Sequence, residues 1–242
     1  MAGKHKNLIY DQWLARTLKR DVYKLVVDDD LVKRARNYDR LKELQDRSVF
    51  IYSKVSPEAL SAVKFLEEQG FNLIDTNIVF EKPIAPSENC TANCDLRFTI
   101  PEDQNQVVEL ARRSFVYSRF HLDSAFPREV ADMIKAEWVG SYFTGNRGDT
   151  MVVALAGDFI IGFLLLIYGE DGTLVIDLIA VDEKYRRKGV AEDMIAFAES
   201  QCHGFTQIRV GTQLANAPSL RLYEGMRFKI TAAQYTFHYH HV

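Results

Sequence analysis

The chain has 242 residues, enough for one large domain or two small domains, each with a buried core. Hydrophobic residues make up 47% and charged residues 26% of the sequence, as in ordinary soluble proteins. A net charge of -3 argues against a nucleic acid as the main partner, because a phosphate backbone requires a basic face. It still allows a local basic pocket for one phosphorylated ligand.

Neither secretion nor membrane insertion is predicted. The first twenty residues are polar and mixed in charge, and the longest apolar run, Phe159–Tyr168, is too short for a membrane helix. Three cysteines, Cys90, Cys94 and Cys202, leave one unpaired, which suits a reducing cytoplasm. Cys90 and Cys94 lie in a polar linker without a second pair of ligands, so we expect two ordinary thiols and no metal.

The first half alternates predicted strands with predicted helices. One helix is expected to begin with Ser56 as its N-cap and Pro57 at its first position, and to end at Gly70. The other predicted elements are a strand at Asp21–Val27, a helix at Asp30–Gln45, and strands at Ser48–Val55 and Phe71–Lys82.

The segment Pro83–Asp95 contains two prolines and several turn formers, so we expect a domain boundary here, between residues 1–94 and 95–242. Segment 118–127 is predicted to be irregular. The other elements expected after the boundary are strands at Leu96–Ile100, Met151–Leu155, Phe159–Tyr168, Thr173–Val181, Gln207–Gly211 and Phe228–Tyr239, and helices at Pro101–Val116, from Pro127 onward, at Val190–Cys202 and at Ala217–Met226.

Two parts of the chain repeat the same order of elements. Ser48–Phe80 predicts a strand, a helix, a glycine, an aromatic residue and a long strand, and Gln207–Phe237 predicts the same series. The chain is therefore expected to consist of two related halves, the first of them truncated. The two long strands can pair between the halves or between subunits, which leaves a homodimer open.

A phosphate-binding loop is predicted between a buried strand and a helix. Gly189 and the small Ala191 let the backbone approach a ligand closely, and the helix that follows adds the positive end of its dipole. Basic side chains surround this turn. A charged surface turn that only caps a helix is the alternative. The loop residues are Arg186, Arg187, Lys188, Gly189, Val190 and Ala191.

The stretch Asp177–Ala191, DLIAVDEKYRRKGVA, resembles the strand–loop–helix signature of the GNAT acyltransferases. The resemblance implies an α/β fold, a mixed and mostly antiparallel sheet flanked by helices, with a truncated GNAT-like half at residues 1–94. It also implies that the loop amides bind the pyrophosphate of an acyl-CoA. Ala180 and Val181 would lie along the pantetheine, and no metal is needed.

Acyl transfer requires a proton donor for the departing thiolate. By the same resemblance, the helix that opens at Asn216 contacts the acyl-CoA and carries the acid, which matches Tyr223; a half-buried core aromatic is the alternative. Asp177 is either a general base or a structural carboxylate, and a water chain can replace the base. The family usually has a glycine just before the last strand, where this chain has Arg227.

The segment RSFVYSRFHLDSAFP, residues 113–127, is similar to the matching region of TDP-fucosamine acetyltransferases and related nucleotide-sugar N-acyltransferases. It implies a role in cell-surface polysaccharide biosynthesis and makes Arg119 and His121 candidate contacts to an amino sugar. An ion pair that orders the loop is the alternative for Arg119, and a hydrogen-bonded structural histidine for His121. The acyl group is acetyl or a larger group such as 3-hydroxybutanoyl.

Two other functions remain open: acetylation of a peptide N-terminus, a lysine or a polyamine, and a binding module without enzymatic activity. The C-terminal histidines are candidate metal ligands, because His238 and His240 share a face of a strand. No acidic or cysteine partner lies near them in the sequence, so we expect an exposed strand end.

Overall fold

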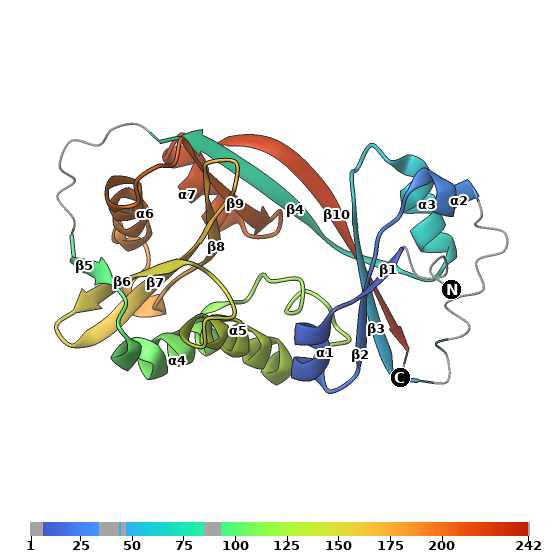
Figure 1. Cartoon of the computed structure of the whole chain (residues 1–242), viewed down its shortest axis with the longest axis horizontal. Helices are drawn as coiled ribbons and strands as arrows, with labels where there is room; N and C mark the ends of the chain where they lie inside the picture. The colour runs from blue at the N-terminus through green and yellow to red at the C-terminus, as the bar shows by residue number, and fades with distance from the viewer. Residues whose placement is uncertain (1–6, 34–43, 45–46, 85–92, 242) are drawn as a thin grey trace.

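The computed structural model describes residues 7–33, 44, 47–84 and 93–241, and its strands form one ten-stranded sheet in the order β1-β2-β3-β10-β4-β9-β8-β7-β6-β5 (Figure 1). Among the described strands, only the pairs β2–β3 and β8–β9 are parallel. The strands are β1 Leu8–Tyr10, β2 Asp21–Leu25, β3 Val49–Val55, β4 Asn72–Pro83, β5 Asp95–Phe98, β6 Thr150–Ala156, β7 Phe159–Tyr168, β8 Thr173–Val181, β9 Gln207–Gln213 and β10 Lys229–His241.

Helices cover both faces of this sheet. α6 and α7 pack on one face of the second half, α2 and α3 cover the same face of the first half, and α4, α5 and α1 cover the opposite face. In the described residues, no helix is long and apolar enough to span a membrane. The helices are α1 Gln12–Leu18, α2 Asp29–Lys33, α3 Leu60–Glu68, α4 Gln104–Ser114, α5 Arg128–Phe143, α6 Val190–Gln201 and α7 Ala217–Gly225.

The internal repeat has a structural counterpart in the units β3-α3-β4 and β9-α7-β10. The four strands lie in the order β3-β10-β4-β9. This order is symmetric: β3 and β9, the first strands of the two units, lie outside, and β10 and β4, their last strands, lie inside. Each long strand therefore pairs with both strands of the other unit. Figure 1 shows β4 and β10 running side by side across the molecule, so the pairing between halves occurs within one chain.

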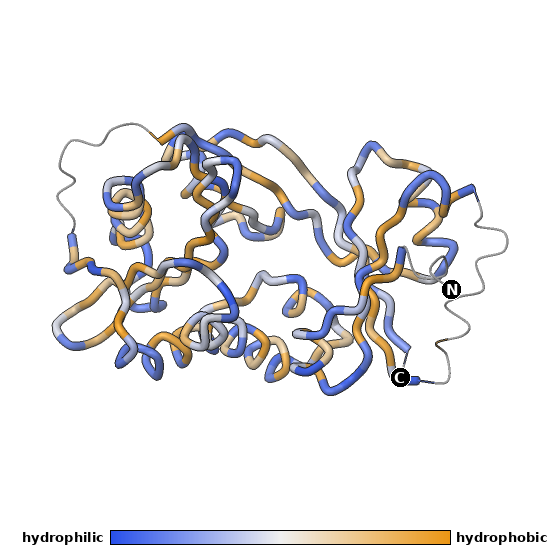
Figure 2. The backbone as a smooth tube through the Cα atoms, viewed as in Figure 1, coloured by the Kyte–Doolittle hydropathy of each residue, from blue (hydrophilic) through white to orange (hydrophobic). Residues whose placement is uncertain are grey.

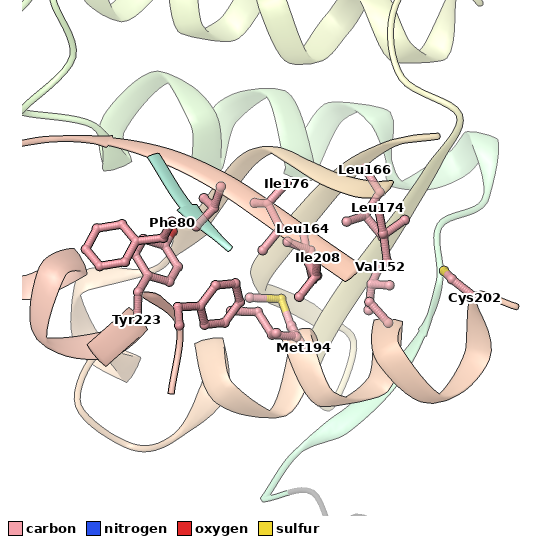
Figure 3. Packing of buried hydrophobic residues seen from close by; sticks show 14 of the residues in the cluster. Phe80, Val152, Leu164, Leu166, Leu174, Ile176, Met194, Cys202, Ile208 and Tyr223 are labelled. Carbon is pink, nitrogen blue, oxygen red and sulfur yellow. The ribbon is translucent and has the colours of Figure 1, made fainter. Parts of the chain in front are cut away.

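Hydrophobic residues concentrate on the strands and on the inner sides of the helices, whereas turns are polar (Figure 2). In the second half, Met194 of α6 packs onto Val152, Leu164 and Ile208 of the sheet (Figure 3). This burial of apolar surface is the main force that holds α6 to the sheet.

Several expected boundaries differ from the structure. α3 begins at Leu60 with Ala59 as its N-cap, so the predicted start at Pro57 is wrong. The Ala59 amide donates to the Ser56 carbonyl, and this turn occupies the residues before the helix. β1 and α1 were not expected, although Asp11 caps α1 by accepting from the Leu14 amide. Most of the helix expected at 30–45 lies outside the described residues, as does Cys90.

The unusual residue before the last strand has a conformational consequence. Arg227 has a φ of 66°, the left-handed backbone that glycine adopts without strain. α7 ends at Gly225, and the Arg227 amide then donates to the Glu224 carbonyl. Arginine thus occupies a position at which the family usually has glycine.

Candidate active site

The sheet opens between β8 and β9. The two strands pair in parallel only as far as Ile176 and Val210, although β8 continues to Val181 and β9 to Gln213. Beyond this point, the side of β8 that faces β9 has no strand partner. The backbone at Ala180 and Val181 therefore lines a gap in which an extended ligand can form hydrogen bonds as a strand would.

The loop after β8 presents a row of free backbone amides. Arg187 and Gly189 have φ values of 62° and 82°, and Gly189 is the N-cap of α6. In the part of the chain that the structure describes, the amides of residues 187–192 donate to no acceptor. Six consecutive free amides at a helix N-terminus form an anion-binding concavity, which suits a pyrophosphate.

Side chains brace this loop on two sides. The Arg186 guanidinium donates to the carbonyls of Val181 and Ser114, each at 3.1 Å, so it joins the loop to the ends of β8 and α4. On the other side, Asp193 accepts from the backbone and side-chain nitrogens of Asn93 at 2.8 and 3.1 Å. Asn93 then lies over Gly189, where an added Cβ would meet its Nδ2 at 3.0 Å.

The expected acid, Tyr223, lies in the apolar layer below the sheet. Its ring packs against Phe80 and Phe228 at centroid distances of 5.6 and 5.5 Å, and the residue is 2% exposed (Figure 3). Burial raises the pKa of its hydroxyl well above the usual value, so this group stays protonated at neutral pH. Asn216 caps α7 by accepting from the Ser219 amide at 3.3 Å.

Asp177 lies on the opposite face, where it forms a three-residue cluster. A bulge in the β7–β8 pairing leaves it between the paired residues Ile176 and Leu178. Its carboxylate accepts two bonds from Arg147, both 2.6 Å, and one from Trp138 Nε1 at 2.9 Å. These contacts are those of a structural carboxylate, because both oxygens are engaged.

The segment after α4 places Arg119 and His121 differently. The Arg119 guanidinium lies over the rings of Tyr52 and Phe120, at 4.0 and 4.4 Å from their centroids. His121 is held between Ser118 Oγ at 2.6 Å and Asp132 Oδ1 at 2.9 Å, and its burial lowers its pKa. Both nitrogens of His121 are engaged, which matches its structural alternative, whereas Arg119 forms no ion pair with a carboxylate among the described residues.

The C-terminal histidines are not an exposed strand end, so that expectation was wrong. His238 is fully buried, and Asp123 Oδ2 accepts from His238 Nδ1 at 2.6 Å and from His240 Nε2 at 2.8 Å. The acidic partner was missed because it lies 115 residues away in the sequence.

These three residues are also a candidate metal site, because their ligand atoms lie within 4.8 Å of one another. However, Arg119 lies 3.3 Å from the second nitrogen of His238, and Arg20 lies 3.3 Å from that of His240. A guanidinium only donates, so each ring must accept on that side and carry its proton toward Asp123. Metal ligation would require the opposite tautomers, and the geometry therefore favours a hydrogen-bond network.

Two buried or partly enclosed residues of this face carried no sequence signal. Lys135 of α5 packs on Trp138 and Phe115, with its Nζ 4.6 and 4.8 Å from their ring centroids. Lys54 of β3 lies on the face of the sheet that carries Tyr52. A lysine in a helix or strand is normally predicted to be a solvated surface residue, so only tertiary packing reveals the burial of Lys135.

The chain belongs to the acetyltransferase (GNAT) family, whose model matches residues 105–228. Enzymes of this family transfer acyl groups from acyl-CoA. Among curated proteins, it is similar to the spore coat polysaccharide biosynthesis protein SpsD of Bacillus subtilis (strain 168). The two are 29% identical over 200 residues, which cover 81% of this chain and 67% of that protein.

Solved structures show the same fold. A GCN5-related N-acetyltransferase from Sphaerobacter thermophilus has a TM-score of 0.63 at 13% identity, covering 96% of this chain and 75% of that one. A conserved protein of unknown function from Staphylococcus epidermidis ATCC 12228 has a TM-score of 0.65 at 14% identity, covering 100% and 94%. A tandem GNAT protein from the clavulanic acid biosynthesis pathway has a TM-score of 0.60 at 13% identity, covering 91% and 75%.

Proposed function

We propose that this protein transfers an acyl group from acyl-CoA to the amine of a TDP- or UDP-linked amino-deoxy sugar. One observation carries the choice of acceptor: Arg119 lies among aromatic rings on the face that the acceptor must approach. Cations and aromatic rings suit a nucleotide sugar, whereas a polyamine would require unpaired acids. The similarity to a polysaccharide biosynthesis protein supports the same acceptor class.

The proposed reaction follows from the two faces of the site. The amides of residues 187–192 hold the pyrophosphate, and the backbone at Ala180 and Val181 orients the pantetheine in the gap beside β8. The sugar amine attacks the thioester carbonyl from the α5 side. When the tetrahedral intermediate collapses, the Tyr223 hydroxyl protonates the departing sulfur.

In this proposal, water rather than Asp177 takes the proton of the attacking amine. Asp177 already accepts three hydrogen bonds, which supports a structural role for it rather than proton abstraction. A sugar amine is less basic than a lysine, so water is a sufficient acceptor for its proton.

The test is release of CoA from acetyl-CoA in the presence of TDP- and UDP-amino sugars, spermidine or a lysine peptide. We expect turnover with a nucleotide sugar. Tyr223→Phe, which keeps the ring in the core, should lower kcat by about a hundredfold or more. Tyr168→Phe is the matched control, because Tyr168 is half-exposed and packs on Phe205, away from the loop and the gap. Turnover of spermidine or the peptide alone would refute the acceptor assignment.

A further inference from the structure

Three cationic side chains gather on the face of the sheet that α5 covers. Lys54 lies two residues beyond Tyr52 on the same face of β3, and Arg119 stacks on the Tyr52 ring. Lys135 lies on α5, which packs on this face. Burial lowers the pKa of both Lys54 and Lys135, and the nearby charge of Arg119 lowers each of them further.

None of these three cations forms an ion pair with a carboxylate in the described ranges of the chain. The acids that lie nearby are mostly engaged elsewhere. Asp177 binds Arg147, Asp123 binds two histidines, and Asp11 accepts from the Tyr52 hydroxyl at 2.9 Å. Asp75 lies near Lys54 without forming an ion pair, and burial raises its pKa to about 6. Within the described residues, these carboxylates therefore form no ion pair with the three cations.

The lysines of this group differ in burial. Lys135 is only 7% exposed, and burial lowers its pKa to about 7. Lys54 is exposed to solvent, yet the surrounding protein lowers its pKa to about 8. A buried cation without a counter-ion destabilises the free protein, and a bound anion removes that cost.

We propose that Lys54, Arg119 and Lys135 form an anion subsite that binds the diphosphate of the acceptor nucleotide. This inference rests on the proposed function, because it assigns the acceptor's charged group to a location. The subsite lies on the opposite face of the sheet from Tyr223, and it is separate from the loop amides that would hold the acyl-CoA. A diphosphate accepts from several donors at once, and the guanidinium of Arg119 can bind two of its oxygens.

Binding can be measured without turnover by titrating TDP, thymidine and inorganic pyrophosphate into the full chain. Saturating CoA is included so that the loop after β8 is occupied. We expect TDP to bind at least about tenfold more tightly than thymidine. Binding should also take up protons near pH 8, because an anion raises the pKa of lysines that are partly neutral there. Calorimetry in buffers of different ionisation enthalpy measures this uptake.

Variants separate the subsite from the rest of the protein. Lys54→Ala and Lys135→Met should each weaken TDP about tenfold, leave thymidine and CoA binding unchanged, and reduce the proton uptake. Lys64→Ala is the matched control, because Lys64 is an exposed lysine of α3 paired with Glu68. If Lys135→Met fails to fold, TDP binding to the Lys54→Ala variant still tests the subsite, because the Lys54 side chain is solvent-exposed.

The outcomes distinguish this subsite from the proposed function. If neither TDP nor pyrophosphate binds, or if both variants bind TDP like the wild type, the subsite is refuted even when a nucleotide sugar is acylated. If TDP binding depends on Lys54 and Lys135 but no nucleotide sugar is acylated, the subsite stands and the proposed reaction is wrong.

Discussion

At the scale of single residues, the backbone of the loop after β8 carries the candidate cofactor chemistry. Gly189 combines a φ of 82° with close contact to Asn93, so it is constrained in two ways. Any side chain here strains the backbone and displaces the group that covers the loop. Position 189 therefore requires glycine, both for its left-handed backbone and to leave space for the Asn93 side chain.

We expect Gly189→Ala to weaken acetyl-CoA binding by about tenfold or more, because the free amides would be reoriented. Gly204→Ala is a matched control: Gly204 has a φ of 89°, but an added Cβ there meets nothing within 4 Å. Calorimetric titration of acetyl-CoA into both variants checks this. Equal losses in the two variants would attribute the effect to general backbone strain.

Arg227 gives a second prediction at this scale. Its left-handed backbone costs roughly 1 kcal/mol relative to glycine, and no hydrogen bond or ion pair of its side chain is found within the described ranges. Arg227→Gly should therefore raise the free energy of unfolding by about 1 kcal/mol, whereas Arg227→Ala should not. Urea denaturation of the three proteins measures this. A gain in the alanine variant would point to charge rather than conformation.

At the scale of elements, the network around Asp123 attaches β10 to the segment that precedes α5. Asp123 accepts from two histidines, and Arg119 and Arg20 complete the chain of contacts. Phe126 and Phe50 enclose the histidine rings. The network thus attaches the segment that carries Arg119 to β10, a strand from the far end of the sequence.

Its stability should depend on pH. Burial lowers the folded-state pKa of His238 to about 4, so below pH 6.5 the unfolded chain binds a proton that the native chain does not. The free energy of unfolding should therefore fall by about 3 kcal/mol between pH 6.5 and pH 4. The lowered pKa of Asp123 extends this loss to still lower pH.

Urea denaturation between pH 7 and pH 4 tests this, with His238→Gln expected to show a shallower decline. His203→Gln, at an exposed position after α6, should follow the wild type. A decline in His238→Gln as steep as in the wild type would mean that other groups control acid sensitivity.

At the scale of the whole molecule, the two halves cannot be separated along the sheet. β4 comes from the first half but lies between β9 and β10 of the second. Ile78 and Phe80 of β4 belong to the same apolar core as α6 and α7. The domain boundary between residues 94 and 95 stays a prediction.

We expect residues 95–242, expressed alone, to aggregate or to melt without cooperativity, because β9 and β10 would lose their shared partner. Co-expression with residues 1–94 should restore a soluble complex. Circular dichroism and thermal melting of both preparations measure this. A fragment that melts cooperatively near the Tm of the full chain would overturn the prediction.

Much of the fold follows from local pattern. The strands β6, β7 and β8 are long apolar runs bounded by turns, and α6 begins directly after the glycine that caps it. The α/β class and the GNAT signature could therefore be predicted from residues close together in the sequence. The internal repeat could be predicted too, because each of its two copies is a short segment. The short first elements were missed because β1 and α1 bury few side chains of their own.

The sequence alone determined the fold class, the loop at 186–191 and the family, because each depends on spacing within one strand, turn or helix. Only the tertiary structure decided which charges meet. Asp123 and His238 are 115 residues apart, and Trp138 reaches Asp177 across 39 residues. Pairing and burial of side chains depend on distances across the sheet, and no local pattern encodes those distances. For the same reason, the sequence does not show that Lys54 and Lys135 have no ion-pair partner among the described residues.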